Sequence, residues 1–239
     1  MSLLIDKIAR SGAVSDFPMP FAAHLNELRR RLINAVLILA TGAVLIFYFS
    51  NRILDYLARP VGTLIFISPL EAFHARLEVA LAGGLILTMP LLLRQAWLFL
   101  APALSVEWRK TVLRMLPLSY LLFAAGSSLG FFVVIPATLK FLLAFGTQSV
   151  RPMMTLGAYL GFVVKMTLAF GAVFQMPLVF YALNRAGLVE RESFASYRKG
   201  VYFLCFVAGA FLSPDVFAQF CIAIPSIVLF EITLLAMRQ

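Results

Sequence analysis

The feature that most constrains the fold of this chain is its long, unbroken runs of apolar residues, which are separated by short charged segments. Inside a bilayer every backbone N–H and C=O needs a partner within the protein, so only helices and closed β-barrels span it. Barrel strands alternate apolar and polar residues, and these runs do not alternate. The sequence therefore predicts an all-α, polytopic membrane protein.

The composition agrees with a membrane protein. Hydrophobic residues make up 62% of the chain and charged residues 13%, whereas soluble domains are about 45–50% apolar and about 25% charged. The net charge of +9 would suggest nucleic acid for a soluble protein. Here the cations stand at the ends of apolar runs, which indicates orientation and contact with membrane lipid, with no nucleic-acid partner. We expect a single membrane domain over residues 1–239.

Six transmembrane helices are predicted. They are Leu32–Phe49, Leu77–Leu98, Val112–Ile135, Gly157–Leu183, Val201–Leu212 and Val216–Met237. An amphipathic surface helix from Phe21 leads into the first span. Pro60 breaks the segment after that span, and the capping box Ser68–Glu71 starts the next helix. A loop is expected from Pro136 to Leu156.

The fifth span is short. Its twelve residues extend about 18 Å, against a hydrocarbon core of about 30 Å. We expect spans five and six to form a short hairpin that thins the bilayer or tilts its neighbours. Partner helices are expected beside this hairpin or at Gln175.

The distribution of Lys and Arg predicts that both termini are cytoplasmic (N-in/C-in), because cytoplasmic loops are enriched in these residues. With the N-terminus inside, fourteen of the twenty cations are cytoplasmic, five are on the far side and Lys165 is within the fourth span. The cytoplasmic set is Lys7, Arg10, Arg29, Arg30, Arg31, Arg94, Arg109, Lys110, Arg114, Arg185, Arg191, Arg198, Lys199 and Arg238. The far-side set is Arg52, Arg59, Arg76, Lys140 and Arg151.

Motifs of enzymes are absent from the chain. It has no GxSxG, no HExxH and no phosphate loop. His24 and His74 lie on opposite sides of the predicted membrane, so they cannot share a metal ion. Cys205 and Cys221 lie in apolar runs, which is typical of buried thiols. We expect no enzyme, no cofactor and no metal site.

Two carboxylates stand among cations on the predicted cytoplasmic side. Glu27 can pair with Arg30 or Arg31 one helical turn later. Glu107 can stabilise the first turn of the third span after a Ser105 cap. Spacing alone favours these structural roles at both positions.

Several polar residues lie inside the spans, where they are costly unless they face protein or water. Lys165 is close enough to the end of its span to snorkel. Gln175 precedes Pro177, which frees a backbone carbonyl that a neighbouring polar group can satisfy. Glu231 lies within the sixth span, and Asp215 opens it at a helix N-terminus.

Five collinear motifs point to a known family. They are HLNELRRRL (His24–Leu32), SPLEAF (Ser68–Phe73), PLLLRQAWLFLAPAL with EWRK (Pro90–Lys110), FGAVFQMPLV (Phe170–Val179) and LSPDVFAQ with AIPSIVLFE (Leu212–Glu231). Together they resemble the TatC family, the multi-span receptor subunit of the twin-arginine protein translocase. Each motif is modest alone, but five in order over six spans are highly specific.

The resemblance implies a function. Such proteins bind the twin-arginine signal peptides of folded precursors on the cytoplasmic face and recruit small single-span Tat subunits of the TatA/TatB type. They form an oligomeric complex in the cytoplasmic inner membrane of bacteria or related organisms. By motif position, Glu27 and Glu107 would contact the twin arginines, since carboxylate and guanidinium pair in a planar geometry.

Other positions are carried over from the same motifs. Arg29 and Phe99 match positions expected to serve signal-peptide binding. Pro60, Gln175, Glu231 and Asp215 match positions expected to serve partner subunits or intramembrane polarity. Many members carry Glu where this chain has Gln175, so a charge there is not required.

Two other classes of protein stay open as alternatives. A secondary transporter for a small solute would have broken helices in two repeated halves, and no such repeat is visible. A membrane-embedded enzyme would need paired catalytic residues. Crosslinking a twin-arginine signal peptide to the purified protein separates the receptor from both.

Overall fold

The computed structural model describes residues 21–100, 106–146, 153–185, 192, 196–213 and 215–237, which are almost entirely helical. The helices are α2 (Phe21–Ala58), α3 (Pro69–Leu100), α4 (Val106–Leu129), the π-helical turn η2 (Gly130–Val134), α5 (Ile135–Leu143), α6 (Leu156–Val173), α7 (Met176–Arg185), α9 (Arg198–Leu212) and α10 (Val216–Ala236).

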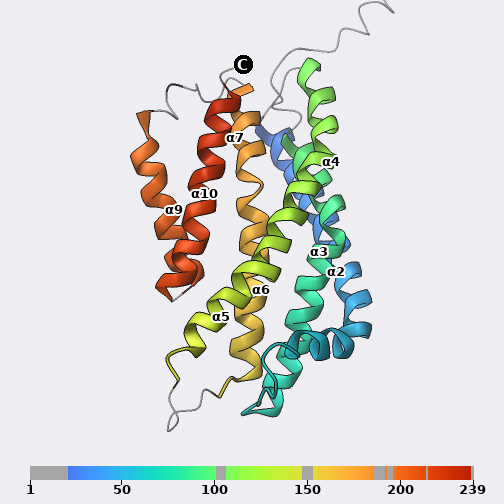
Figure 1. The fold of residues 1–239 in the computed structure, drawn as a ribbon. Helices are drawn as coiled ribbons and strands as arrows, with labels where there is room; N and C mark the ends of the chain where they lie inside the picture. Colours follow the sequence, from blue (N-terminus) through green and yellow to red (C-terminus); the bar gives the residue numbers. More distant parts are fainter. Residues whose placement is uncertain are drawn as a thin grey trace, which may run out of the picture.

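Successive spans cross the molecule in alternating directions, so α2 starts and α10 ends at the upper end in Figure 1. Within the described parts of the chain, five helical segments are long and apolar enough to cross a membrane. They are Leu25–Ala58, Pro69–Phe99, Met115–Leu143, Leu156–Asn184 and Val216–Ala236. The further helix, α9, has 15 residues and is about 22 Å long. The prediction of an all-α membrane protein with six spans and a short final hairpin is confirmed.

The first helix is longer than predicted. The expected surface helix and the first span form one continuous helix, α2, which runs on to Ala58. It ends just before Pro60 and Gly62, and Gly62 has a φ of 82°, in the left-handed region that glycine adopts without steric cost. α3 starts at Pro69 as the capping box predicts, and the Leu70 N–H donates to Ser68 Oγ at 3.3 Å.

The third span also extends beyond its predicted end. Its helix does not stop at Pro136 but passes through η2 into α5 and ends at Leu143. Pro136 lies in the first turn of α5, directly after the wider π-helical turn. An N–H is not required at that position, so the proline does not break the helix. The loop predicted from Pro136 therefore begins only after Leu143.

The fourth predicted span is divided in two. α6 ends at Val173 and α7 begins at Met176, with Phe174 and Gln175 in the turn between them. Pro177 lies in the first turn of α7, where its missing N–H costs no hydrogen bond. The proline thus starts a new helix instead of kinking a continuous one, and Gln175 lies at the break.

α6 is central to the core. Leu160, Met166 and Phe170 on this helix are almost completely buried. α4 approaches so closely that a Cβ added at Gly126 would lie 2.5 Å from the Phe170 carbonyl oxygen. α2, in contrast, packs mainly along α3 and leaves most of its apolar surface exposed, as expected for a helix facing lipid.

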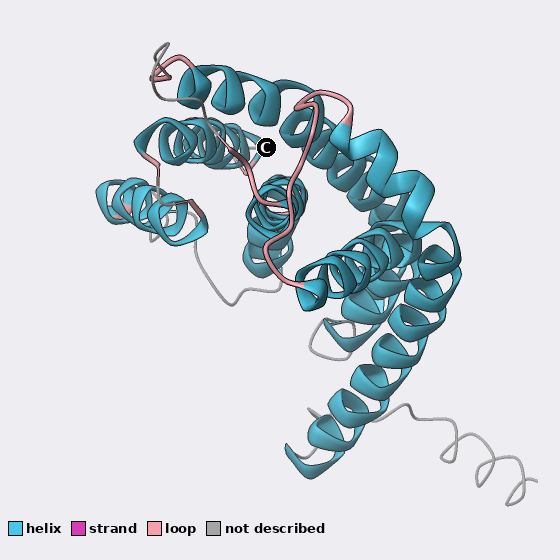
Figure 2. Cartoon of the chain, turned by 90° about the horizontal axis from the view of Figure 1, so that it is seen from below, coloured by secondary structure: helices cyan, strands magenta, loops and turns pink. Residues whose placement is uncertain are grey.

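At the lower end, the loop from α2 to α3 is joined to the start of α6 (Figure 2). The Ile65 N–H donates to the Met154 carbonyl at 3.2 Å, and the Leu156 N–H donates to the Ile65 carbonyl at 2.8 Å. The Glu71 carboxylate accepts from Gly157 N–H and from Ile67 N–H, each at 2.8 Å. Apart from the local bond of Ile67, these bonds connect segments that are 86 or more residues apart in the chain.

Candidate functional site

Three elements that carry predicted peptide-binding residues meet at the upper end of the molecule. α2 begins there, α3 ends there and α4 begins there (Figure 1). Glu27 lies near the start of α2, and Phe99 lies half-buried in the last turn of α3. Glu107 is in the first turn of α4, but its side chain lies outside the described residues.

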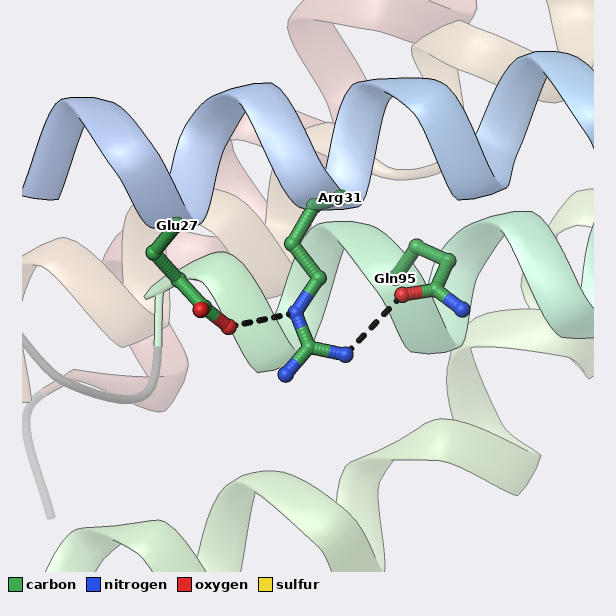
Figure 3. Close-up of polar contacts among 3 residues, drawn as sticks. All are labelled: Glu27, Arg31 and Gln95. Atoms are coloured by element: carbon green, nitrogen blue, oxygen red, sulfur yellow. Dashed lines mark hydrogen bonds and ion pairs between the residues drawn. The ribbon is translucent and has the colours of Figure 1, made fainter.

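Glu27 already holds a guanidinium group. Arg31 Nε donates to Glu27 Oε1 at 2.7 Å, and Arg31 Nη1 donates to Gln95 Oε1 on α3 at 3.1 Å (Figure 3). The two charged side chains are each about one-quarter exposed, at 25% and 24%. The pairing predicted with Arg30 or Arg31 is therefore made with Arg31. Gln95 was not predicted, because a partner 64 residues away leaves no spacing signal.

Arg29 and Arg30 are exposed on α2 and belong to no ion pair among the described residues. A basic surface thus surrounds one paired carboxylate. Such a surface discourages a simple cation, and it admits a ligand that can satisfy the carboxylate with well-placed donors.

Gln175 takes part in a polar network within the spans. Ser119 Oγ donates to Gln175 Oε1 at 2.5 Å, and Gln175 Nε2 donates to the Ser119 carbonyl at 2.9 Å. Trp97 Nε1 donates to Ser119 Oγ at 3.3 Å. This network links α3, α4 and the break between α6 and α7. Sequence reasoning missed Ser119, although a small polar residue inside an apolar span is itself a signal.

Glu231 joins the two helices of the final hairpin. Tyr202 donates its hydroxyl hydrogen to Glu231 Oε1 at 2.5 Å, and Arg198 Nη2 lies 3.3 Å from Glu231 Oε2. Both partners are on α9, so the carboxylate on α10 is neutralised within the hairpin. This arrangement explains how a carboxylate is tolerated in a membrane-spanning helix.

Asp215 caps α10. Its Oδ1 accepts from the Ala218 N–H at 2.7 Å and its Oδ2 accepts from Ser213 Oγ at 2.5 Å. This is the helix N-terminus role that its position predicts. Pro60 lies exposed in the turn after α2 at the lower end. The structure therefore brings neither Pro60 nor Asp215 together with Gln175, and the predicted intramembrane set is distributed over several places.

Among the described residues, no group of three or more His, Cys, Asp or Glu side chains is arranged to hold a metal ion. The side chains of Gln175, Glu231 and Asp215 are instead hydrogen-bonded to neighbouring side chains or to backbone, as buried polar groups generally are. They are suited to binding and positioning within a membrane protein.

Comparison with known proteins agrees with this architecture. The model of the family "Sec-independent protein translocase protein (TatC)" matches residues 23–225. The protein of this name from Aquifex aeolicus (strain VF5) is 38% identical over 224 residues, covering 90% of this chain and 93% of the relative. The Carboxydothermus hydrogenoformans protein is 35% identical over 227 residues, covering 92% and 93% respectively.

Solved structures agree as well. A crystal structure of the twin-arginine translocase receptor TatC superposes with a TM-score of 0.80 at 37% identity, covering 89% of this chain and 96% of that chain. A second, of TatC in DDM, has a TM-score of 0.82 at 37% identity, with 89% and 98% covered. Sequence, span arrangement and fold agree throughout, and this chain belongs to the TatC family of protein translocase subunits.

Proposed function

We propose that this protein binds twin-arginine signal peptides at its upper end, which faces the cytoplasm, and that Glu27 and Glu107 contact the two arginines. Family membership supports the class of ligand, since a related structure is described as a twin-arginine translocase receptor. The observation that carries the proposal is the Glu27–Arg31 pair, in which the chain's own guanidinium engages the carboxylate at 2.7 Å. A carboxylate able to hold one arginine has suitable chemistry for another.

The two proposed carboxylates come from different elements. Glu27 belongs to α2 and Glu107 to the start of α4. Only a ligand with two correctly spaced arginines would satisfy both at once. Arginine is favoured over lysine, because its planar fork donates two parallel hydrogen bonds to one carboxylate. Arg29 and Phe99 would complete the surface around the peptide.

We also propose that the protein recruits single-span Tat subunits of the TatA/TatB type in a bacterial or related cytoplasmic inner membrane. The short hairpin supports this, because α9 exposes large apolar side chains, Phe203 and Phe211 among them, along its length. The break at Gln175 is a second candidate contact. The relatives carry the name of a transport protein, and we expect no catalytic activity.

Photo-crosslinking of a twin-arginine signal peptide to the purified protein tests peptide binding. Glu107→Gln keeps the side-chain shape and removes the charge, so we expect crosslinking to fall about tenfold or more at matched protein level. Glu27→Gln should reduce crosslinking less than Glu107→Gln does, because the Glu27 carboxylate already binds Arg31 and has less interaction energy to offer the peptide. Glu192→Gln, an exposed carboxylate before α9, is the matched control and should bind normally. Undiminished crosslinking to Glu107→Gln would reject the assignment.

Disulfide scanning tests recruitment. Cysteines on the exposed face of α9, such as Phe203→Cys, should form disulfides with cysteines placed in the partner span. Cysteines on the exposed face of α4, such as Leu121→Cys, should not. Disulfides formed only by Leu121→Cys would place the partner span against α4 and reject contact with α9.

A further inference from the structure

A cavity of about 620 Å³ lies beneath the hairpin of α9 and α10. α5 slants below the hairpin, and the hairpin stops short of the lower ends of α5 and α6 (Figure 1). Mostly apolar side chains line the cavity, including Leu139 and Leu142 of α5 and Phe162 of α6. Two charged residues, Lys165 and Asp215, also line it.

Lys165 is an exposed cation inside a span. It follows the start of α6 at Leu156 by nine residues, which is about 14 Å along the helix. It forms no ion pair among the described residues, although Glu78 on α3 attracts it electrostatically. A cation at this depth needs water or an anionic group close to it.

Asp215 offers the opposite charge to the same cavity. Its oxygens each accept one hydrogen bond, from Ala218 N–H and from Ser213 Oγ, and each retains capacity for another. Asp215 stands at the lower end of the hairpin. Since α9 has only 15 residues and spans about 22 Å, the membrane surface has to approach this end, and lipid headgroups with it.

We propose that this cavity binds the headgroup of a zwitterionic phospholipid with a primary amine, drawn from the leaflet at the lower end. The phosphate pairs with Lys165 and the ammonium with Asp215, while the acyl chains lie along Leu139, Leu142 and Phe162. This site is independent of signal-peptide binding, which is proposed at the opposite end of the molecule.

The local charges select this headgroup class. Lys165 and Asp215 place one positive and one negative charge at the cavity. A purely anionic headgroup would meet repulsion from Asp215, although the chain as a whole carries +9. A choline headgroup has no N–H to donate to Asp215. An ethanolamine headgroup satisfies both charged side chains.

Native mass spectrometry of the full chain, released from nanodiscs of equal parts phosphatidylethanolamine, phosphatidylglycerol and phosphatidylcholine, tests the site. We expect phosphatidylethanolamine to be retained about threefold or more over the other two, as for a partly exposed charge pair. Lys165→Gln should reduce the retained lipid by a similar factor. Lys199→Gln, an exposed cation at the upper end of α9, makes the same charge change and should have no effect.

Asp215→Asn provides the decisive comparison. Asparagine is a good helix cap, so α10 keeps its N-terminal bond while the charge is lost. We expect this variant to lose its preference for phosphatidylethanolamine and to take up phosphatidylglycerol equally well, with unchanged thermal stability in detergent.

Three outcomes would overturn the proposal. The wild-type protein could retain all three lipids equally, or Lys165→Gln could retain as much lipid as wild type. The third is that Asp215→Asn keeps the preference for phosphatidylethanolamine. A photo-reactive residue in place of Phe162 adds a fourth test in native membranes. We expect it to crosslink to lipid, and a crosslink to a protein instead would assign the cavity to a partner helix.

Discussion

Arg31 occupies the position that a ligand's arginine would take at Glu27, and Gln95 holds its second nitrogen in place. A peptide that binds Glu27 as proposed would therefore have to compete with an internal guanidinium. Ion pairs at i, i+4 on a helix contribute about 0.3–0.5 kcal/mol, and the bond to Gln95 adds to that. The competition is modest, and it works against weak or single-arginine ligands.

Arg31→Met removes this competitor and retains a helix-forming side chain of similar length. We expect the affinity for a twin-arginine peptide to rise about two- to fivefold, measured as a Kd by fluorescence anisotropy. Arg30→Met removes the same charge from an exposed neighbour that pairs with no described carboxylate and should not tighten binding. If Arg31→Met weakens binding, Arg31 positions Glu27 and does not compete for it. If wild type binds no twin-arginine peptide, the proposed function itself fails.

Ser119 connects Trp97 and Gln175 inside the spans. Ser119→Ala leaves an indole N–H and an amide oxygen without this partner, which in membrane proteins costs about 0.6 to 2 kcal/mol. We expect a lower melting temperature in detergent. Ser128→Ala, an exposed serine on the same helix, is the matched control and should melt like wild type. Equal melting of both variants would show that water replaces the network.

At the scale of whole helices, close contact between α2 and α3 depends on two glycines. A Cβ added at Gly84 would lie 2.5 Å from the backbone nitrogen of Ala43 on α2, and one added at Gly42 would lie 2.9 Å from the Gly84 carbonyl oxygen. Backbone atoms cannot move aside as a side chain can. Small residues therefore allow these two long helices to pack backbone against backbone.

Gly84→Ala should separate α2 from α3 locally. We expect a destabilisation of about 1–3 kcal/mol from overpacking, which exceeds the gain of up to about 1 kcal/mol from the better helix propensity of alanine. Gly200→Ala in α9 has open space around the added methyl group and should be neutral or slightly stabilising. Thermal unfolding of the two variants in detergent measures the difference. A Gly84→Ala protein as stable as Gly200→Ala would contradict the close packing.

For the molecule as a whole, the membrane orientation follows from the charge distribution. A six-span bundle in which α2 starts and α10 ends at the same end could insert in either orientation. The excess of Lys and Arg in the segments predicted to lie on that side favours its exposure to the cytoplasm. The lower end then carries the loop around Ile65 and the segment before α6.

Cysteine labelling of whole cells or spheroplasts tests this orientation. The native Cys205 and Cys221 are first replaced by alanine, and single cysteines are placed at Ile67, Met153 or Lys199, all exposed positions. We expect a membrane-impermeant maleimide to label Ile67→Cys and Met153→Cys from outside. Lys199→Cys should react only after permeabilisation. The reverse pattern would invert the proposed topology.

The apolar runs alone determined the fold class and the number of spans, because burial of such runs in lipid depends on composition over some twenty residues and not on distant contacts. The capping box at Ser68 determined where α3 starts, and the i, i+4 spacing of Glu27 and Arg31 anticipated their pair. These are local interactions, which a sequence contains in full.

Tertiary structure decided the rest. Whether Pro136 and Pro177 end a helix or start one depended on the π-helical turn before the first and the break before the second. Ser119 meets Gln175 across 56 residues, and Lys165 shares a cavity with Asp215 on another helix. Contacts of this kind arise only when helices pack in one particular arrangement, because no local spacing relates residues so far apart in the chain.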